Sequence, residues 1–140
     1  MSRKVRDVMT KDLVCMPADT TIKKAAEVMR DNDIGDVVVT SEAGRVCGIA
    51  TDRDLVVRAV SQGATPDEVT LGDVCSQHVI VMSPSDSVKD AVALMRDEAL
   101  RRLVVVDGGR PVGIVSLGDL ARERDPQSAL ADISSAEPNT

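Results

Sequence analysis

The first half of the chain alternates between short apolar runs, which are typical of strands, and longer segments with helical spacing. Residues 13–16 form a short apolar run that ends at Pro17 and predicts a first strand. Residues 36–40 are a continuous Val-rich run, which predicts a strand buried on both faces. Residues 46–50 follow after a polar turn and predict a strand paired with it.

Helices are predicted on either side of these paired strands. After Asp19, which we expect to be the N-cap, apolar residues recur at helical spacing to about Asn32. A second helix is predicted to begin at Thr51, directly after the last strand, and to run to about Ser61. Residues 5–9 predict a fraction of a helix ahead of the first strand. The repeating order is therefore strand, helix, strand, strand, helix.

The same order begins again in the second half of the chain. Residues 71–75 correspond to residues 5–9, and the sequence Met-Arg-Asp that starts at Met29 returns 66 positions later at Met95. Asp86 corresponds to Asp19 as the expected N-cap of the repeated helix. The chain therefore contains two tandem copies of one supersecondary unit.

A unit of about 60 residues buries too little surface to be stable alone. We therefore predict an α+β fold in which two β-α-β-β-α repeats pack sheet to sheet with internal pseudo-twofold symmetry. The chain beyond the second repeat contains Ser, Ala and Pro with few large apolar residues, so we expect a mobile tail. The predicted boundaries are 5–62 for the first repeat, 63–70 for the linker, 71–124 for the second repeat and 125–140 for the tail.

Each repeat ends its last strand with the same short polar motif, GIATDRD in the first and GIVSLGD in the second. In each motif a hydroxyl residue, Thr51 or Ser116, is followed three positions later by an acid, Asp54 or Asp119. This is the pattern of a capping box, in which the two side chains accept hydrogen bonds from each other's backbone N–H groups. A single copy would be interpreted as a cap, whereas its recurrence after a buried strand in both repeats favours a ligand site.

The groups in this motif suit a nucleoside phosphate. A hydroxyl and the N–H groups at a helix start can donate to phosphate, and a carboxylate can accept from the vicinal hydroxyls of a ribose. The chain has no Phe, Tyr or Trp, so a base would have to lie between aliphatic walls of the Val-rich strands.

Composition narrows the possible functions. The net charge of −6 disfavours a general nucleic-acid surface. One His and three scattered cysteines disfavour a tetrahedral metal site, and Cys15 and Cys47 are expected to be small core hydrophobes because each lies in an apolar run. No apolar run approaches the roughly 20 residues needed to span a bilayer, and the N-terminus has no apolar signal core. We therefore predict a cytoplasmic protein without a membrane partner.

The repeat, the two motifs and the run that begins at Leu103 before a Gly-Gly hairpin together resemble a standalone tandem pair of cystathionine-beta-synthase (CBS) domains, a Bateman module. The resemblance covers about residues 5–124. It implies a non-catalytic sensor that binds AMP, ADP, ATP or S-adenosylmethionine in clefts between the two repeats and signals by conformation or assembly. It also implies a homodimer of such pairs, an unidentified protein target and no required cofactor.

The resemblance also implies roles for individual residues. Asp54 and Asp119 would hold the ribose hydroxyls, and residues of the strands would line the base. Arg101 and Arg102 stand where many members carry a basic pair that faces phosphates, as in the regulatory gamma subunit of the AMP-sensing kinase. The candidate ligand-binding residues are Val14, Cys15, Asp36, Val37, Thr51, Arg53, Asp54, Ile80, Val81, Arg101, Arg102, Leu103, Ser116 and Asp119.

The first repeat departs from this pattern, because Gly35 and Asp36 replace the basic pair. Asp36 would repel a nearby phosphate, and Arg53 compensates only in part, so we expect two unequal sites. One alternative is a structural or protein-interaction CBS pair that has lost nucleotide binding, in which the motifs are only caps. An enzyme is disfavoured, since the sequence shows no nucleophile–base pair, metal cluster or Walker-type loop.

Overall fold

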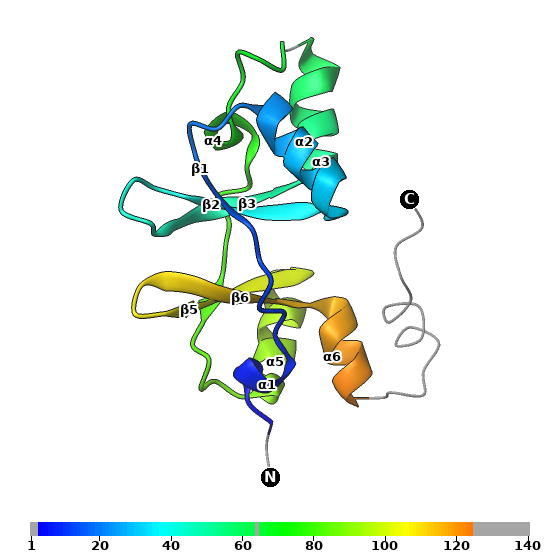
Figure 1. Ribbon diagram of the computed structural model, residues 1–140. Helices are drawn as coiled ribbons and strands as arrows, with labels where there is room; N and C mark the ends of the chain where they lie inside the picture. The colour runs from blue at the N-terminus through cyan, green and yellow to red at the C-terminus, as the bar shows by residue number, and fades with distance from the viewer. Residues whose placement is uncertain (1–2, 64, 125–140) are drawn as a thin grey trace. The chain divides into compact units, whose positions relative to one another are not determined.

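The computed structural model describes residues 3–63 and 65–124, shown in colour in Figure 1. The chain divides into two compact units, one made of Val14–Val79 and the other of the residues up to Leu13 together with those from Ile80 onward. We call them the Thr51 unit and the Ser116 unit, after the motif hydroxyl that each contains. The tail predicted at residues 125–140 lies outside the described residues.

The Thr51 unit is built on a three-stranded mixed sheet with the order β1-β2-β3. The pairing is parallel between β1 and β2 and antiparallel between β2 and β3. Its elements are β1 (Cys15–Pro17), α2 (Ile22–Asn32), β2 (Asp36–Thr40), β3 (Val46–Thr51), α3 (Asp52–Asp54), the π-helical turn η1 (Leu55–Ala59), the 3-10 turn η2 (Val60–Gln62) and α4 (Leu71–Val74).

The Ser116 unit repeats this plan with the sheet order β4-β5-β6, again parallel then antiparallel. Its elements are α1 (Val5–Val8), β4 (Val81–Met82), α5 (Val88–Glu98), β5 (Arg102–Asp107), β6 (Arg110–Ser116) and α6 (Leu117–Arg124). The predicted α+β fold with two like repeats is confirmed, while the packing of one sheet on the other stays a prediction.

The apolar side of one helix packs against one face of the central strand in each unit. In the Thr51 unit, Ile22 and Met29 on α2 pack with Val37 and Val39 on β2, and all four are buried. Strand side chains alternate between faces, so Asp36 on β2 belongs to the opposite face. Burying each such aliphatic side chain is worth roughly 1.5–3 kcal/mol relative to exposing it. The Ser116 unit has the equivalent core between α5 and β5, with Val88, Met95, Leu103 and Val105.

Several local predictions were wrong at element ends. The N-caps of α2 and α5 are Thr21 and Ser87, whose side chains accept from the backbone N–H groups of Lys24 and Asp90 at 3.2 and 3.0 Å. Asp19 and Asp86 instead lie in the turns that precede these helices, which begin at Ile22 and Val88.

The predicted burial of two cysteines was also wrong. Cys15 and Cys47 are exposed, and Cys75 is buried. Cys15 lies on the short edge strand β1 and Cys47 on the edge strand β3, where a side chain that points away from the α2 core has little to cover it.

The helix predicted from Thr51 to Ser61 consists of three successive helical turns of different type. After the α-helical turn α3, the π-helical turn η1 carries an extra residue per turn, and η2 is tighter. Leu55 and Ala59 are the buried residues of η1 and pack into the core beneath α2. The two residues are four positions apart and therefore face the core from the same side of the turn.

A backbone bridge ties the strand of each motif to a segment from outside that repeat. Thr10 and Ile114 exchange two hydrogen bonds, of 2.8 and 3.0 Å, and Ile49 and Ser76 do the same at 3.2 and 2.9 Å. A Cβ on Gly48 would lie 2.3 Å from the Ser76 carbonyl oxygen, which explains the glycine before the isoleucine. The short helices α1 and α4 therefore belong to the compact unit of the other repeat's motif.

Helices α2 and α5 both end in a residue with left-handed backbone geometry. Asp33 has φ 58° and Ala99 has φ 54°, and the next N–H in each case reaches back 3.0 Å to the carbonyl of Met29 or Met95. Left-handed geometry costs a residue with a Cβ about 1–2 kcal/mol, while aspartate tolerates it better than alanine.

We predict that Ala99→Gly raises the free energy of unfolding by up to about 1 kcal/mol, because relief of the Cβ strain exceeds the added chain entropy of glycine. Denaturant unfolding followed by circular dichroism measures this. Ala93→Gly, inside the same helix, is the control and should lower stability by about 1 kcal/mol. Equal losses in both variants would contradict the strain at Ala99.

Candidate ligand site at the two capping motifs

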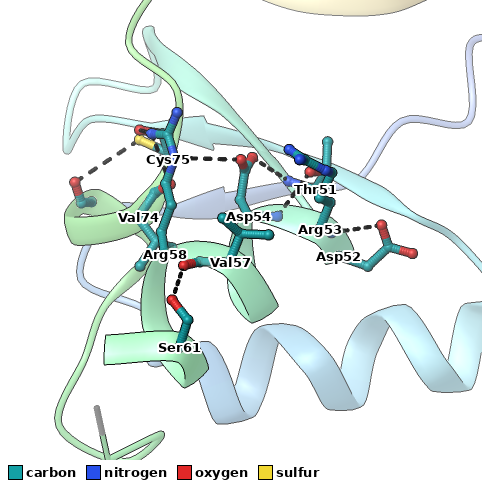
Figure 2. A network of polar contacts seen from close by, with 10 residues as sticks. Thr51, Asp52, Arg53, Asp54, Val57, Arg58, Ser61, Val74 and Cys75 are labelled. Carbon is teal, nitrogen blue, oxygen red and sulfur yellow. Dashed lines mark hydrogen bonds and ion pairs between the residues drawn. The ribbon is translucent and has the colours of Figure 1, made fainter. Parts of the chain in front are cut away.

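The motif of the Thr51 unit forms a complete capping box at the end of β3 (Figure 2). The Asp54 backbone N–H donates to the Thr51 Oγ1 at 3.1 Å, and the Thr51 backbone N–H donates to the Asp54 Oδ2 at 2.9 Å. The Asp54 side chain is only 17% exposed. The two hydrogen bonds therefore hold a largely buried carboxylate in one orientation at the end of the strand.

An arginine one turn further along faces the second oxygen of this carboxylate. The Arg58 Nε lies 3.7 Å from the Asp54 Oδ1, and its Nη1 donates to the carbonyl oxygens of Val74 and Cys75, both at 3.4 Å (Figure 2). A cation suits these carbonyls because they close the C-terminal end of α4. Arg58 thus connects the motif to the bridging segment. The sequence interpretation missed it, although its i,i+4 spacing from Asp54 was the signal that could have found it.

The motif of the Ser116 unit has the same construction. The Asp119 backbone N–H donates to the Ser116 Oγ at 3.2 Å, and the Ser116 backbone N–H donates to the Asp119 Oδ2 at 2.9 Å. The Arg122 Nη2 forms an ion pair with the Asp119 Oδ1, and the Asp119 side chain is 6% exposed. Arg122 was also missed, and it is the i,i+3 counterpart of Arg58.

A polar cavity of about 450 Å³ opens at the Ser116 motif. The predicted basic pair lies there, because Arg102 is the register partner of Ser116, and the Leu117 N–H donates to the Arg101 carbonyl at 2.9 Å. The cavity is lined by Arg101, Arg102, Ser116, Leu117, Gly118, Asp119 and Arg122.

The Thr51 unit has the same backbone arrangement with different side chains. Asp36 is the register partner of Thr51, and the Asp52 N–H donates to the Gly35 carbonyl at 3.0 Å. Gly35 and Asp36 therefore occupy the positions of Arg101 and Arg102. Arg53, which was predicted to compensate, is exposed, and its backbone N–H donates to the Asp52 carboxylate at 2.8 Å.

The strand residues predicted to line a base do not border this cavity. Val37 and Leu103 are fully buried and belong to the cores beneath α2 and α5. Cys15 and Val81 are exposed on edge strands, where they pair with the central strands of their sheets. Val14 and Ile80 lie just before β1 and β4 and pack partly buried against the cores. A contact of any of these six residues with a base stays a prediction.

Neither shifted thiol is activated as a nucleophile. Burial raises the pKa of Cys75, and the nearby Cys47 raises it further. Partial desolvation by neighbouring residues raises the pKa of the Cys15 thiol, although the residue is exposed on its edge strand. A raised thiol pKa lowers the thiolate fraction near neutral pH, whereas reactive cysteines have lowered values.

The CBS domain family model matches residues 5–61 and residues 71–125 of this chain. The chain belongs to the CBS domain family. Its two CBS domains end in the two capping motifs described above, and their strands and helices are those of the two repeats.

Relatives of this CBS pair occur in bacteria and archaea. The CBS domain-containing protein YhcV of Bacillus subtilis is 36% identical over 134 residues, with 93% of this chain and 94% of the relative covered. The uncharacterized protein MK0525 of Methanopyrus kandleri is 41% identical over 117 residues, which cover 83% of this chain and 60% of the relative. The chain thus spans less than two thirds of MK0525 and nearly all of YhcV.

Two solved structures share the fold. The crystal structure of Hypoxic Response Protein I with two coordinated zinc ions has a TM-score of 0.76 and 31% identity, covering 86% of this chain and 98% of that one. The CBS domain pair of protein MJ0100, solved with 5′-methylthioadenosine and S-adenosyl-L-methionine, has a TM-score of 0.78 and 23% identity, covering 91% of this chain and 100% of that one.

Within residues 3–63 and 65–124, no group of three or more His, Cys, Asp or Glu side chains is placed to hold a metal ion. The helices in this part of the chain are all too short or too polar to cross a membrane.

Loss of the cap hydroxyl should destabilise the ligand-free protein. We predict that Thr51→Ala lowers the free energy of unfolding by about 1 kcal/mol, because the Asp54 N–H loses its acceptor. Thr51→Ser keeps the acceptor and is the control, and denaturant unfolding without ligand measures both. Unchanged stability in Thr51→Ala would show that the capping hydrogen bond does not hold the motif.

Proposed function

We propose that this CBS pair is a non-catalytic regulatory module that binds an adenosine-containing ligand through its two motifs. The observation that carries the proposal is the fixed carboxylate of Asp119, which lines a polar cavity together with Ser116. A hydroxyl and a pre-oriented carboxylate at one cavity are the groups that a ribose needs. The MJ0100 pair, solved with two adenosine-containing molecules, supports the ligand class.

The carboxylates keep acceptor capacity for a ribose. An ionised carboxylate offers about four lone-pair positions. The Asp119 Oδ2 accepts the Ser116 N–H and its Oδ1 faces Arg122, so a position remains on each oxygen. Two vicinal hydroxyls can therefore donate to a group whose orientation is already fixed, which lowers the entropy lost on binding.

Regulation by such a module requires a ligand that prefers one conformation. A ligand shifts a two-state equilibrium only by its difference in affinity for the two states. We propose that the bound ligand changes the conformation or assembly of the CBS pair, which is then sensed by a protein partner.

One observation favours a second candidate, a structural or interaction CBS pair without a nucleotide. In both motifs each carboxylate oxygen already faces a donor, the capping N–H on one side and an arginine on the other. In that case the motifs are caps, and Asp54 and Asp119 contribute only to stability.

We also propose that the CBS pair forms a homodimer through its helices. An apolar groove of about 580 Å³ is lined by residues of α2, η1 and η2, among them Val56 and Val60, which are 58% and 59% exposed. The Ser116 unit has a groove of about 390 Å³ between α5 and α6, with Leu117 48% exposed. Exposed apolar surface of this kind is typical of association sites.

Sedimentation equilibrium tests the dimer. We predict that Val60→Asp weakens self-association at least tenfold, which corresponds to about 1.4 kcal/mol, because a charge would be buried in the groove. Val57→Asp is the control, since Val57 is exposed on the preceding turn η1 but does not line the groove. A chain that is monomeric before substitution would contradict the proposal.

Ligand binding is tested by calorimetry and by thermal unfolding with an external dye, since the chain has no Trp or Tyr to report it. The probes are AMP, ADP, ATP, S-adenosylmethionine and 5′-methylthioadenosine. At 100 times its dissociation constant, a bound ligand should add about 2.7 kcal/mol to stability. Asp119→Asn should remove most of this gain while keeping an acceptor for the cap.

The unliganded stability of Asp119→Asn and Asp54→Asn must be measured first, so that a lost cap is not mistaken for lost binding. If none of the five compounds stabilises the protein at millimolar concentration, the second candidate replaces the first.

A further inference from the structure

The guanidinium of Arg58 contacts the motif acid and the end of α4 at the same time (Figure 2). Its Nε lies 3.7 Å from the Asp54 Oδ1, and its Nη1 donates to the carbonyl oxygens of Val74 and Cys75, both at 3.4 Å. Because a guanidinium is planar and rigid, its Nε and Nη1 move together. A movement of Arg58 toward or away from the carboxylate therefore also changes both contacts with the carbonyls.

The contacts with the carbonyls are long enough to be broken by a small movement. Such hydrogen bonds usually measure about 2.7–3.2 Å between the heavy atoms, so those of the Arg58 Nη1 at 3.4 Å are at the weak end. The Arg58 side chain is 51% exposed, whereas the Asp54 side chain is 17% exposed and accepts the capping N–H. Asp54 is therefore the fixed partner, and its carboxylate sets the position of Arg58.

The segment that Arg58 contacts is the one by which the chain leaves the Thr51 unit, which ends a few residues beyond Cys75. Ser76, directly after Cys75, exchanges two backbone hydrogen bonds with Ile49 on the motif strand. The buried Cys75 also lies against this strand, since a Cβ on Gly48 would come within 3.0 Å of its Sγ. A change at the Arg58 contacts therefore reaches both the motif strand and the chain that leads into the other unit.

We infer that Arg58 is a positioning residue that links the state of the Asp54 carboxylate to the segment after α4. When no ligand is bound, the negative charge of Asp54 holds the guanidinium where its Nη1 reaches the two carbonyls. The ligand step rests on the proposed function, because ribose hydroxyls that donate to Asp54 take up part of the charge that attracts Arg58. The guanidinium then withdraws, and the segment after α4 is held less firmly.

A double-mutant cycle without ligand tests the link. Its readout is hydrogen exchange of the Ser76 backbone N–H, which donates to the Ile49 carbonyl at 2.9 Å. Arg58→Gln and Asp54→Asn should each speed this exchange about fivefold, because either change ends the contact of the guanidinium with the two carbonyls. The double variant should also be only about fivefold faster, since both substitutions break the same link.

Lys24→Gln is the matched control for this cycle. Lys24 is exposed on α2 of the same unit, so its substitution removes one positive charge and should leave Ser76 exchange unchanged. The Val38 N–H, which donates to the Val14 carbonyl at 2.9 Å within the sheet, reports unfolding of the whole unit. Ser76 should exchange faster than Val38 in every variant, as expected for a local opening.

Three results of the cycle would overturn the inference. If Asp54→Asn leaves Ser76 exchange unchanged while Arg58→Gln speeds it, Arg58 holds the carbonyls without help from Asp54. If the two effects multiply in the double variant, the two residues act independently. If Ser76 exchanges no faster than Val38 in every variant, the segment has no local opening for Arg58 to control.

The ligand step is tested with AMP and 5′-methylthioadenosine, and the backbone amide signal of Asp54 reports occupancy of this motif. Binding should speed Ser76 exchange about threefold in the natural chain and leave it unchanged in Arg58→Gln. Unchanged or slower Ser76 exchange in the natural chain, with the motif occupied, would overturn the inference while the proposed function stands. If the chain binds no adenosine compound, the proposed function falls, and the ligand-free cycle still decides whether Arg58 and Asp54 are linked.

Discussion

The strand that carries each motif is held by a backbone bridge at its glycine-isoleucine pair. Ile49 exchanges hydrogen bonds with Ser76, and Ile114 does so with Thr10. Only glycine permits the approach, because a Cβ on Gly48 would lie 2.3 Å from the Ser76 carbonyl oxygen. Each bridging segment comes from the other repeat in sequence order, so neither motif is complete without chain from outside its repeat. The capping box begins two residues after the isoleucine, so this bridge also fixes the position of the box.

The two motifs share a scaffold but differ in charge. Both carboxylates accept a capping N–H on one oxygen and face an arginine on the other. Capping and ion pairing depend on the local helix start, which is the same in both units. The register partner of the motif hydroxyl is on the neighbouring strand, and there Asp36 replaces Arg102. The two motifs therefore have the same position in the fold, while the charge next to the motif hydroxyl depends on the neighbouring strand.

Sequence periodicity predicted the two repeats, their central strands and both capping boxes, because these depend on short-range spacing. It could not predict that α1 and α4 each belong to the compact unit that contains the other repeat's motif. That arrangement depends on contacts between residues far apart in the sequence. Cys15 and Cys47 were misplaced because a short edge strand does not reveal which face is covered. Arg58 and Arg122 were missed because exposed arginines on helices are usually solvated, and only the ion pairs with the motif acids distinguish them.

Side-chain NMR of the arginine Nε–H groups during titration with AMP tests the central claim most directly. The account predicts that the signals of Arg101, Arg102 and Arg122, which line the cavity with Ser116 and Asp119, shift as AMP binds. Unchanged signals at all three arginines, while calorimetry shows that AMP is bound, would contradict it.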